Sequence, residues 1–267
     1  MANVENDDDL IIGGADSVRD ENAPEGANRH STLFTGDGFC FPHPLNSRRC
    51  GAGLTQTPII EIRDSLSELA EPQIEALGRL LPALLCGEES SFHVFSREAG
   101  RLTQVALSRS LALARRIAVE ELEHERLITD LRNCCPVPDD LAIIRLRAHR
   151  FFLRMACRDR ALHFAKVAAL DSAVCVILAA VTKPLGRARV IVETFDRIRG
   201  DEARHVRFSR EHSCELGADR SMLADTAACV RSELVALLYP LASSLEDLGL
   251  DADRLFRRVE ADKCVIN

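Results

Sequence analysis

Aromatic residues are scarce in this chain: they make up 4% of its 267 residues, with no tryptophan and one tyrosine. Strands prefer aromatic and β-branched residues, so the signals for β-structure are weak. From about residue 60 onward the sequence is dominated by alanine, leucine, arginine and glutamate, which favour helices. The sequence therefore predicts an all-α protein.

The chain also lacks a net positive charge and cysteine pairs with C-x-x-C spacing. The formal net charge is −7, whereas a general nucleic-acid-binding protein usually carries a basic surface. There are ten cysteines but no C-x-x-C pair, which argues against zinc-ribbon and thioredoxin-like proteins. Several cysteines lie at apolar helical positions, where a free thiol acts as a small hydrophobic group. We therefore expect a reducing, cytoplasmic compartment and no nucleic-acid partner.

Long hydrophobic runs are missing as well. The most apolar segment, residues 167–181, contains Asp171 and is too short to span a bilayer. The N-terminal segment MANVENDDDL is acidic and lacks the apolar core of a signal peptide. We expect no membrane partner.

The chain divides by composition into two parts. Residues 1–55 are rich in Gly, Asn, Asp, Pro and Ser and predict a disordered or loop-rich N-terminal extension. Residues 56–267 predict a helical domain. The expected helices cover residues 69–98, 102–134, 139–182, 187–216, 219–245 and 251–262. Four consecutive long helices with short links predict an antiparallel four-helix bundle with additional C-terminal helices.

Two Glu-x-x-His motifs stand on these helices. Glu121 and His124 lie in VEELEHERL, and Glu202 and His205 lie in DEARHVRF. A spacing of three puts both side chains of a motif on one helix face, and that face also carries the apolar stripe. One such motif could be an accident of a helix surface. Two motifs on core-facing stripes bury carboxylates that need partners, and the sequence predicts that metal ions are those partners.

This pair of motifs resembles the ferritin-like di-iron carboxylate proteins, in which two helices each supply a Glu and two others each supply a Glu-x-x-His. The segment DEARHVRF is similar to the fourth helix of the p-aminobenzoate N-oxygenase-like branch. The resemblance covers about residues 70–216, and it implies a ferritin-like bundle. It also implies a non-haem di-iron oxygenase that activates O2 to hydroxylate or N-oxygenate a small organic substrate, in specialised metabolism.

The resemblance requires one acid from each remaining helix. In the first helix the choice lies between Glu88 and Glu89, and Glu88 is preferred because it shares the stripe of Leu77 and Leu81. The third helix contains no Glu, so Asp171 takes that place. The implied metal ligands are Glu88, Glu121, His124, Asp171, Glu202 and His205.

The resemblance also implies roles for these residues. Glu121 and Glu202 would bridge or chelate the metals, and each histidine would hold one metal. Residues expected to support the ligands are Glu89, Asp130, Asp159, His163, Asp196 and Asp201. Ile198 stands where the aminobenzoate enzymes carry an extra histidine, which weakens the case for N-oxygenation.

A site of carboxylates and two imidazoles suits two iron ions, with manganese as an alternative. The expected partners are O2, a small-molecule substrate and an external electron donor, and a homodimer is an open alternative. Two other functions fit the same sequence: a ferritin-like protein for metal storage or peroxide scavenging, and a metal-free helical scaffold.

Overall fold

The computed structural model describes residues 59–104 and 108–262, and within those ranges it contains helices and no strand. The prediction of an all-α protein is confirmed for this part of the chain. The predicted N-terminal extension, residues 1–55, lies outside the described residues.

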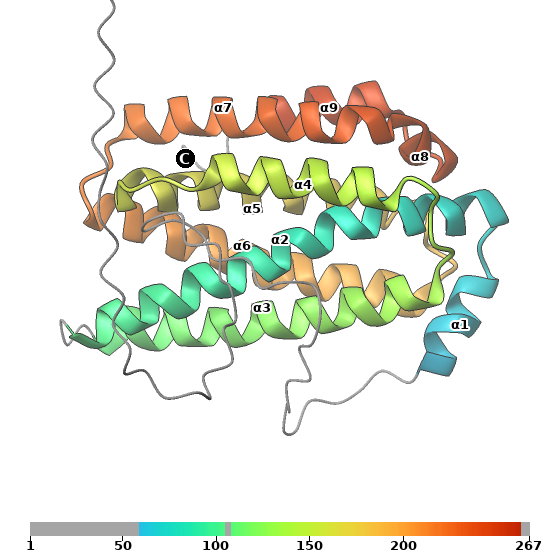
Figure 1. Cartoon of the computed structure of the whole chain (residues 1–267), viewed down its shortest axis with the longest axis horizontal. Coiled ribbons are helices and arrows are strands. Elements are labelled where there is room, and N and C mark those ends of the chain that lie inside the picture. Colours follow the sequence, from blue (N-terminus) through green and yellow to red (C-terminus); the bar gives the residue numbers. More distant parts are fainter. Residues whose placement is uncertain (1–58, 105–107, 263–267) are drawn as a thin grey trace, which may run out of the picture. The chain divides into compact units, whose positions relative to one another are not determined.

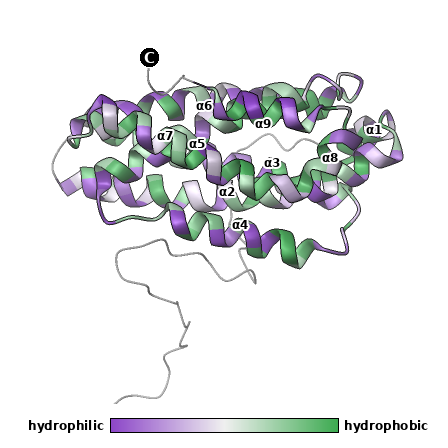
Figure 2. Cartoon of the chain, turned by 90° about the horizontal axis from the view of Figure 1, so that it is seen from above, coloured by the Kyte–Doolittle hydropathy of each residue, from purple (hydrophilic) through white to green (hydrophobic). Residues whose placement is uncertain are grey.

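Four long helices form the core of the bundle, and the others flank them (Figure 1). The core helices are α2 (Glu71–Gln104), α3 (Ser108–Cys134), α5 (Arg160–Val181) and α6 (Arg189–Glu215). The flanking elements are α1 (Ile59–Ser67), α4 (Leu141–Met155), α7 (Arg220–Leu238), a 3-10 turn (Tyr239–Leu241), α8 (Ala242–Asp247) and α9 (Ala252–Glu260). Hydrophobic and hydrophilic residues occur together on each helix, the pattern of amphipathic packing (Figure 2).

The prediction of one continuous helix over residues 139–182 is wrong. The structure divides this range into α4 and α5, because Ala156 leaves the helix with extended backbone angles. Asp159 then begins α5 as its N-cap, and its side chain accepts a hydrogen bond from the backbone N–H of Leu162 at 3.1 Å. The chain therefore turns back between α3 and α5, and α4 makes the return.

The return helix sets the direction of α5. Two apolar layers run across the bundle and meet all four core helices. One layer includes Phe95, Ala114, Phe164 and Phe208, and the other includes Leu81, Ile128, Leu178 and Phe195. Along α3 and α5 the numbering increases from the first layer to the second, and along α2 and α6 it decreases. The helices α3 and α5 are therefore parallel, which corrects the expectation that all consecutive bundle helices alternate.

The helix α5 is the most enclosed of the four. It is apolar enough and long enough to cross a membrane, yet most of that stretch is buried inside the protein. It packs against α6 on one side and against α7 and α9 on another. Its buried acid, Asp171, lies between the two apolar layers, at the level where the Glu-x-x-His motifs also lie.

Candidate metal centre

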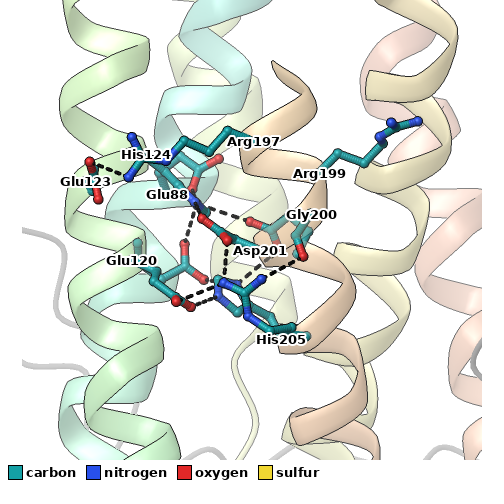
Figure 3. Close-up of polar contacts among 12 residues, drawn as sticks. Glu88, Glu120, Glu123, His124, Arg197, Arg199, Gly200, Asp201 and His205 are labelled. Atoms are coloured by element: carbon teal, nitrogen blue, oxygen red, sulfur yellow. Dashed lines mark hydrogen bonds and ion pairs between the residues drawn. The ribbon is translucent and has the colours of Figure 1, made fainter. Parts of the chain in front are cut away.

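The six predicted ligands meet between the two apolar layers of the bundle. They come from α2, α3, α5 and α6, and each of them is at most 4% exposed. Figure 3 shows Glu88, His124 and His205 pointing toward one another from three different helices. The structure thus brings together Glu88, Glu121, His124, Asp171, Glu202 and His205, and we call this set the carboxylate–histidine cluster.

One half of the cluster surrounds His124. Its Nδ1 lies 3.3 Å from Glu88 Oε2, 3.4 Å from Glu202 Oε1 and 3.9 Å from Glu121 Oε2. One donor atom from each of these four residues lies within 4.8 Å of all the others. Buried donors this close together could hold one metal ion.

The other half surrounds His205. Its Nδ1 lies 3.0 Å from Glu121 Oε1 and 3.4 Å from Glu202 Oε2. Asp171 lies close enough to the cluster for the charges of Glu202, Glu121, His205 and Glu88 to act on it. Glu121 and Glu202 therefore each direct one carboxylate oxygen toward His124 and the other toward His205.

The ionisable groups of the cluster shift one another's pKa values. Burial, together with the neighbouring carboxylates, raises the pKa of Glu121 and of Asp171 well above the ordinary values. Burial opposes a charge on His124, but the neighbouring acids Asp201, Glu202 and Glu88 raise its pKa to about 12. His205 and His124 in turn overcome the effect of burial on Glu202 and hold its pKa at about 2.

Several donor atoms of the cluster make no contact with hydrogen-bond geometry among the described residues, although some of them lie at ion-pair distance from one another. These atoms are Glu88 Oε2, Glu121 Oε1, His124 Nδ1, Asp171 Oδ2 and His205 Nδ1. A buried polar atom without a hydrogen bond is costly, and here five of them belong to one cluster. Oxygen and nitrogen donors of this kind fit a metal ion, so the residues present match the predicted group.

The outer ring nitrogens of the two histidines are held by acids. His124 Nε2 lies 3.1 Å from Asp201 Oδ2, and His205 Nε2 lies 3.0 Å from Glu120 Oε2. In each case the acid comes directly before the Glu of the opposite motif. Arg204 contacts both acids, with Nη2 at 2.9 Å from Glu120 Oε1. An Nε2–H donated outward leaves Nδ1 free to face the cluster.

The sequence predicted Asp201 as a residue that supports the ligands, but Glu120 was not predicted in this role. Burial would raise the pKa of Glu120, but His205, Arg116 and Arg204 outweigh it and lower that pKa to about 2. The signal was available: an acid precedes the Glu in both motifs, in EE-x-x-H and in DE-x-x-H.

Other residues expected to support the ligands lie elsewhere. Glu89 faces Cys86 and Arg145, and burial raises its pKa. Asp196 is paired with Arg199 at 2.9 Å on the protein surface. Asp159 caps α5, as described above.

His163 and Asp130 also lie outside the cluster. His163 hydrogen-bonds the backbone of Met155, beyond the apolar layer of Phe95, and burial lowers its pKa to about 4. Asp130 lies beside Arg126, and burial raises its pKa.

No protein-family model, curated protein or solved structure matches this chain. The structure itself shows a helical bundle with a buried carboxylate–histidine cluster that could hold metal.

Proposed function

We propose that this chain is a non-haem di-iron oxidoreductase that uses O2 to oxidise a small organic substrate, by hydroxylation or N-oxygenation. One observation carries the proposal: Glu121 and Glu202 each direct one oxygen toward each of two buried histidines. Two carboxylates shared in this way suit a pair of metal ions rather than one. Mixed carboxylate and imidazole donors favour iron, with manganese as the alternative.

The topology of the bundle supports the same proposal. Ferritin-like folds have one long crossover, which makes the second and third bundle helices parallel. Here α4 supplies such a crossover, and α3 and α5 are parallel on either side of it. The two Glu-x-x-His motifs lie on α3 and α6, and the two single acids lie on α2 and α5. We infer a ferritin-like bundle.

Each side chain then has a role. Glu88 and His124 would hold one metal, Asp171 and His205 the other, and Glu121 and Glu202 both. Bound iron would supply the reduction of O2 and the oxidation of the substrate. Asp201 and Glu120 keep a proton on Nε2 of each histidine, which presents Nδ1 to the metals. The apolar layers on both sides exclude water from the site.

An apolar cavity favours an enzyme over a storage protein. It reaches the cluster at Glu88, Asp171 and Glu202, and the rest of its wall is almost entirely hydrophobic. Iron ions entering for storage need polar ligands on their way, whereas an organic substrate needs an apolar surface.

The test is anaerobic loading with Fe(II), followed by elemental analysis and then exposure to O2. We expect two iron ions per chain, and O2 consumption that depends on the bound iron. A parallel sample loaded with Mn(II) should show a magnetically coupled pair by electron paramagnetic resonance. Metal content at trace level after loading would contradict the whole proposal. Bound iron that does not react with O2 would contradict the proposed oxidation of a substrate by O2.

A further inference from the structure

A cavity of about 120 Å³ lies between the core helices and the helices that cover them. One water molecule requires about 10–15 Å³ by the same measure, so the cavity is large enough for an organic ligand. Its wall comes from α2, α5 and α6 on the side of the cluster, and from α4, α7 and α8 on the outer side.

The cavity follows α2 and α5. Along α2 its wall extends from Leu77 to Ser91, and along α5 from Leu170 to Val181. At 1.5 Å of rise per residue, the stretch of α2 is about 20 Å long. The cavity is therefore elongated along the helices, and we call it the channel.

The wall of this channel is aliphatic. Leucine, isoleucine, valine and alanine side chains make up most of it, and Phe152 and Phe195 are its aromatic members. Its polar side chains are Ser91 and the three carboxylates of the cluster, and its lining residues include no lysine, arginine or histidine. A charged or strongly polar group inside the channel would therefore lack a partner, which disfavours polar ligands.

The channel reaches the cluster from one side only. Glu88, Asp171 and Glu202 line it, whereas His124 and His205 do not. Gly87 stands next to Glu88, and a Cβ atom placed there would lie 3.3 Å from Phe152 Cζ. The missing side chain at Gly87 keeps the channel open beside the carboxylates.

We propose that this channel binds an unbranched alkyl chain and brings one of its carbons to the carboxylate–histidine cluster. The statement that the alkyl chain is the substrate rests on the proposed function. Binding of the alkyl chain itself does not require metal. An elongated aliphatic channel fits a flexible alkyl chain better than a rigid ring, and hydrophobic burial supplies the affinity.

The test measures binding of 1-hexanol, 1-octanol and 1-decanol to the metal-free protein by isothermal titration calorimetry. If the chain is buried, affinity should increase about fourfold per added methylene. Aniline should bind more weakly than 1-hexanol. Affinity that does not change with chain length, or aniline binding more tightly than 1-hexanol, would overturn the proposal.

Two variants narrow the channel from two different helices. Ala83→Leu adds bulk from α2, and Val174→Phe adds bulk from α5. Each should weaken 1-decanol binding by at least about tenfold, the equivalent of two buried methylenes. Ala236→Leu, at an exposed position of α7, is the matched control and should bind 1-decanol as the unaltered chain does. Full affinity in both channel variants, with helical circular dichroism retained, would also overturn the proposal.

These results separate the two proposals. Alcohol binding without metal uptake would leave the channel standing and remove the di-iron function. Metal uptake without alcohol binding would retain the metal centre and remove the alkyl substrate.

Discussion

Two buried clusters of glutamate and histidine lie in the same bundle, and they are completed in different ways. The second one lies further along the same helices: Glu98 follows Glu88 by ten residues on α2, and His212 follows His205 by seven on α6. His212 Nε2 lies 2.9 Å from Glu98 Oε1, and Arg160 binds the same carboxylate. Burial would raise the pKa of Glu98, but His212 and Arg160 outweigh it and lower that pKa.

The difference lies in the supply of positive charge. Glu98 receives the guanidinium of Arg160, and Arg101 adds a second one 3.6 Å from its other oxygen. Four carboxylates in the carboxylate–histidine cluster face only two imidazoles, and two of those carboxylates have a raised pKa. Arg204 reaches the outer acids only. A buried acid is stable when a cation accompanies it, so the incomplete cluster is the one that fits a metal.

The largest effect is expected from Glu202→Ala. This residue directs an oxygen to both halves of the cluster, so its removal should reduce metal content to background. The variant should stay folded, because His124 and His205 keep Asp201 and Glu120 as partners at their Nε2 atoms. Elemental analysis and circular dichroism measure the two outcomes. Glu211→Ala, an exposed position on the same helix, is the control and should load fully. Full metal content in Glu202→Ala would contradict the ligand set.

Glu98→Ala should show the opposite behaviour. It leaves His212 buried without its carboxylate and Arg160 without its pair, which should lower the free energy of unfolding by about 3 kcal/mol. Metal content should not change. Urea denaturation of the metal-free protein measures the loss, and Glu98→Gln, which keeps a hydrogen-bonding group, should lose less. A loss below about 1 kcal/mol, the worth of an ordinary hydrogen bond, would show that the cluster is not a stabilising ion pair.

The helices and the core-facing motifs could be predicted because they depend on local periodicity. Glu121, His124, Glu202 and His205 stand on apolar stripes that are visible in the sequence. Asp171 was implied by the resemblance, which requires one acid from this helix, and the helix offers no glutamate.

The division into α4 and α5 could not be predicted in this way. No proline or glycine marks the break, and the helix ends where Asp159 competes for the backbone as an N-cap. Glu120 was missed because an acid beside a ligand resembles an exposed residue until the opposite helix is in place. The channel depends on α7 covering α5, a contact between distant parts of the chain.

The acids behind the histidines should have a smaller effect than the ligands. Asp201→Asn removes the charge behind His124, and Glu120→Gln does so behind His205. Each should weaken metal binding by about 10–100-fold, because such partners orient the imidazole and raise its basicity. Anaerobic competition with a chelator measures the affinity, and each variant should weaken one of the two metals more than the other. Asp196→Asn, on the surface of α6, is the control, and an equal loss there would remove the assigned role.

The last prediction concerns pH, and it separates the two clusters by the pH range in which each one gains or loses a proton. Neighbouring acids raise the pKa of His124 to about 12 despite burial, so the metal-free protein keeps that proton at neutral pH. A metal bound at Nδ1 must displace it, so metal affinity should increase with pH, by about tenfold per unit for each proton released. Glu98 has a lowered pKa, so its stabilising effect is present above its unfolded pKa and is lost only in more acidic solution.

Between pH 6 and 8 Glu98 therefore stays ionised, and the proton release on metal binding belongs to the carboxylate–histidine cluster. Calorimetry of metal binding in buffers of different ionisation enthalpy counts the protons. We expect at least two per pair of metals, one from each histidine, with further release from Glu121 and Asp171, whose pKa is raised. Metal affinity that does not vary across this range would mean that neither imidazole loses a proton, and hence that the metals do not bind at Nδ1 of His124 and His205.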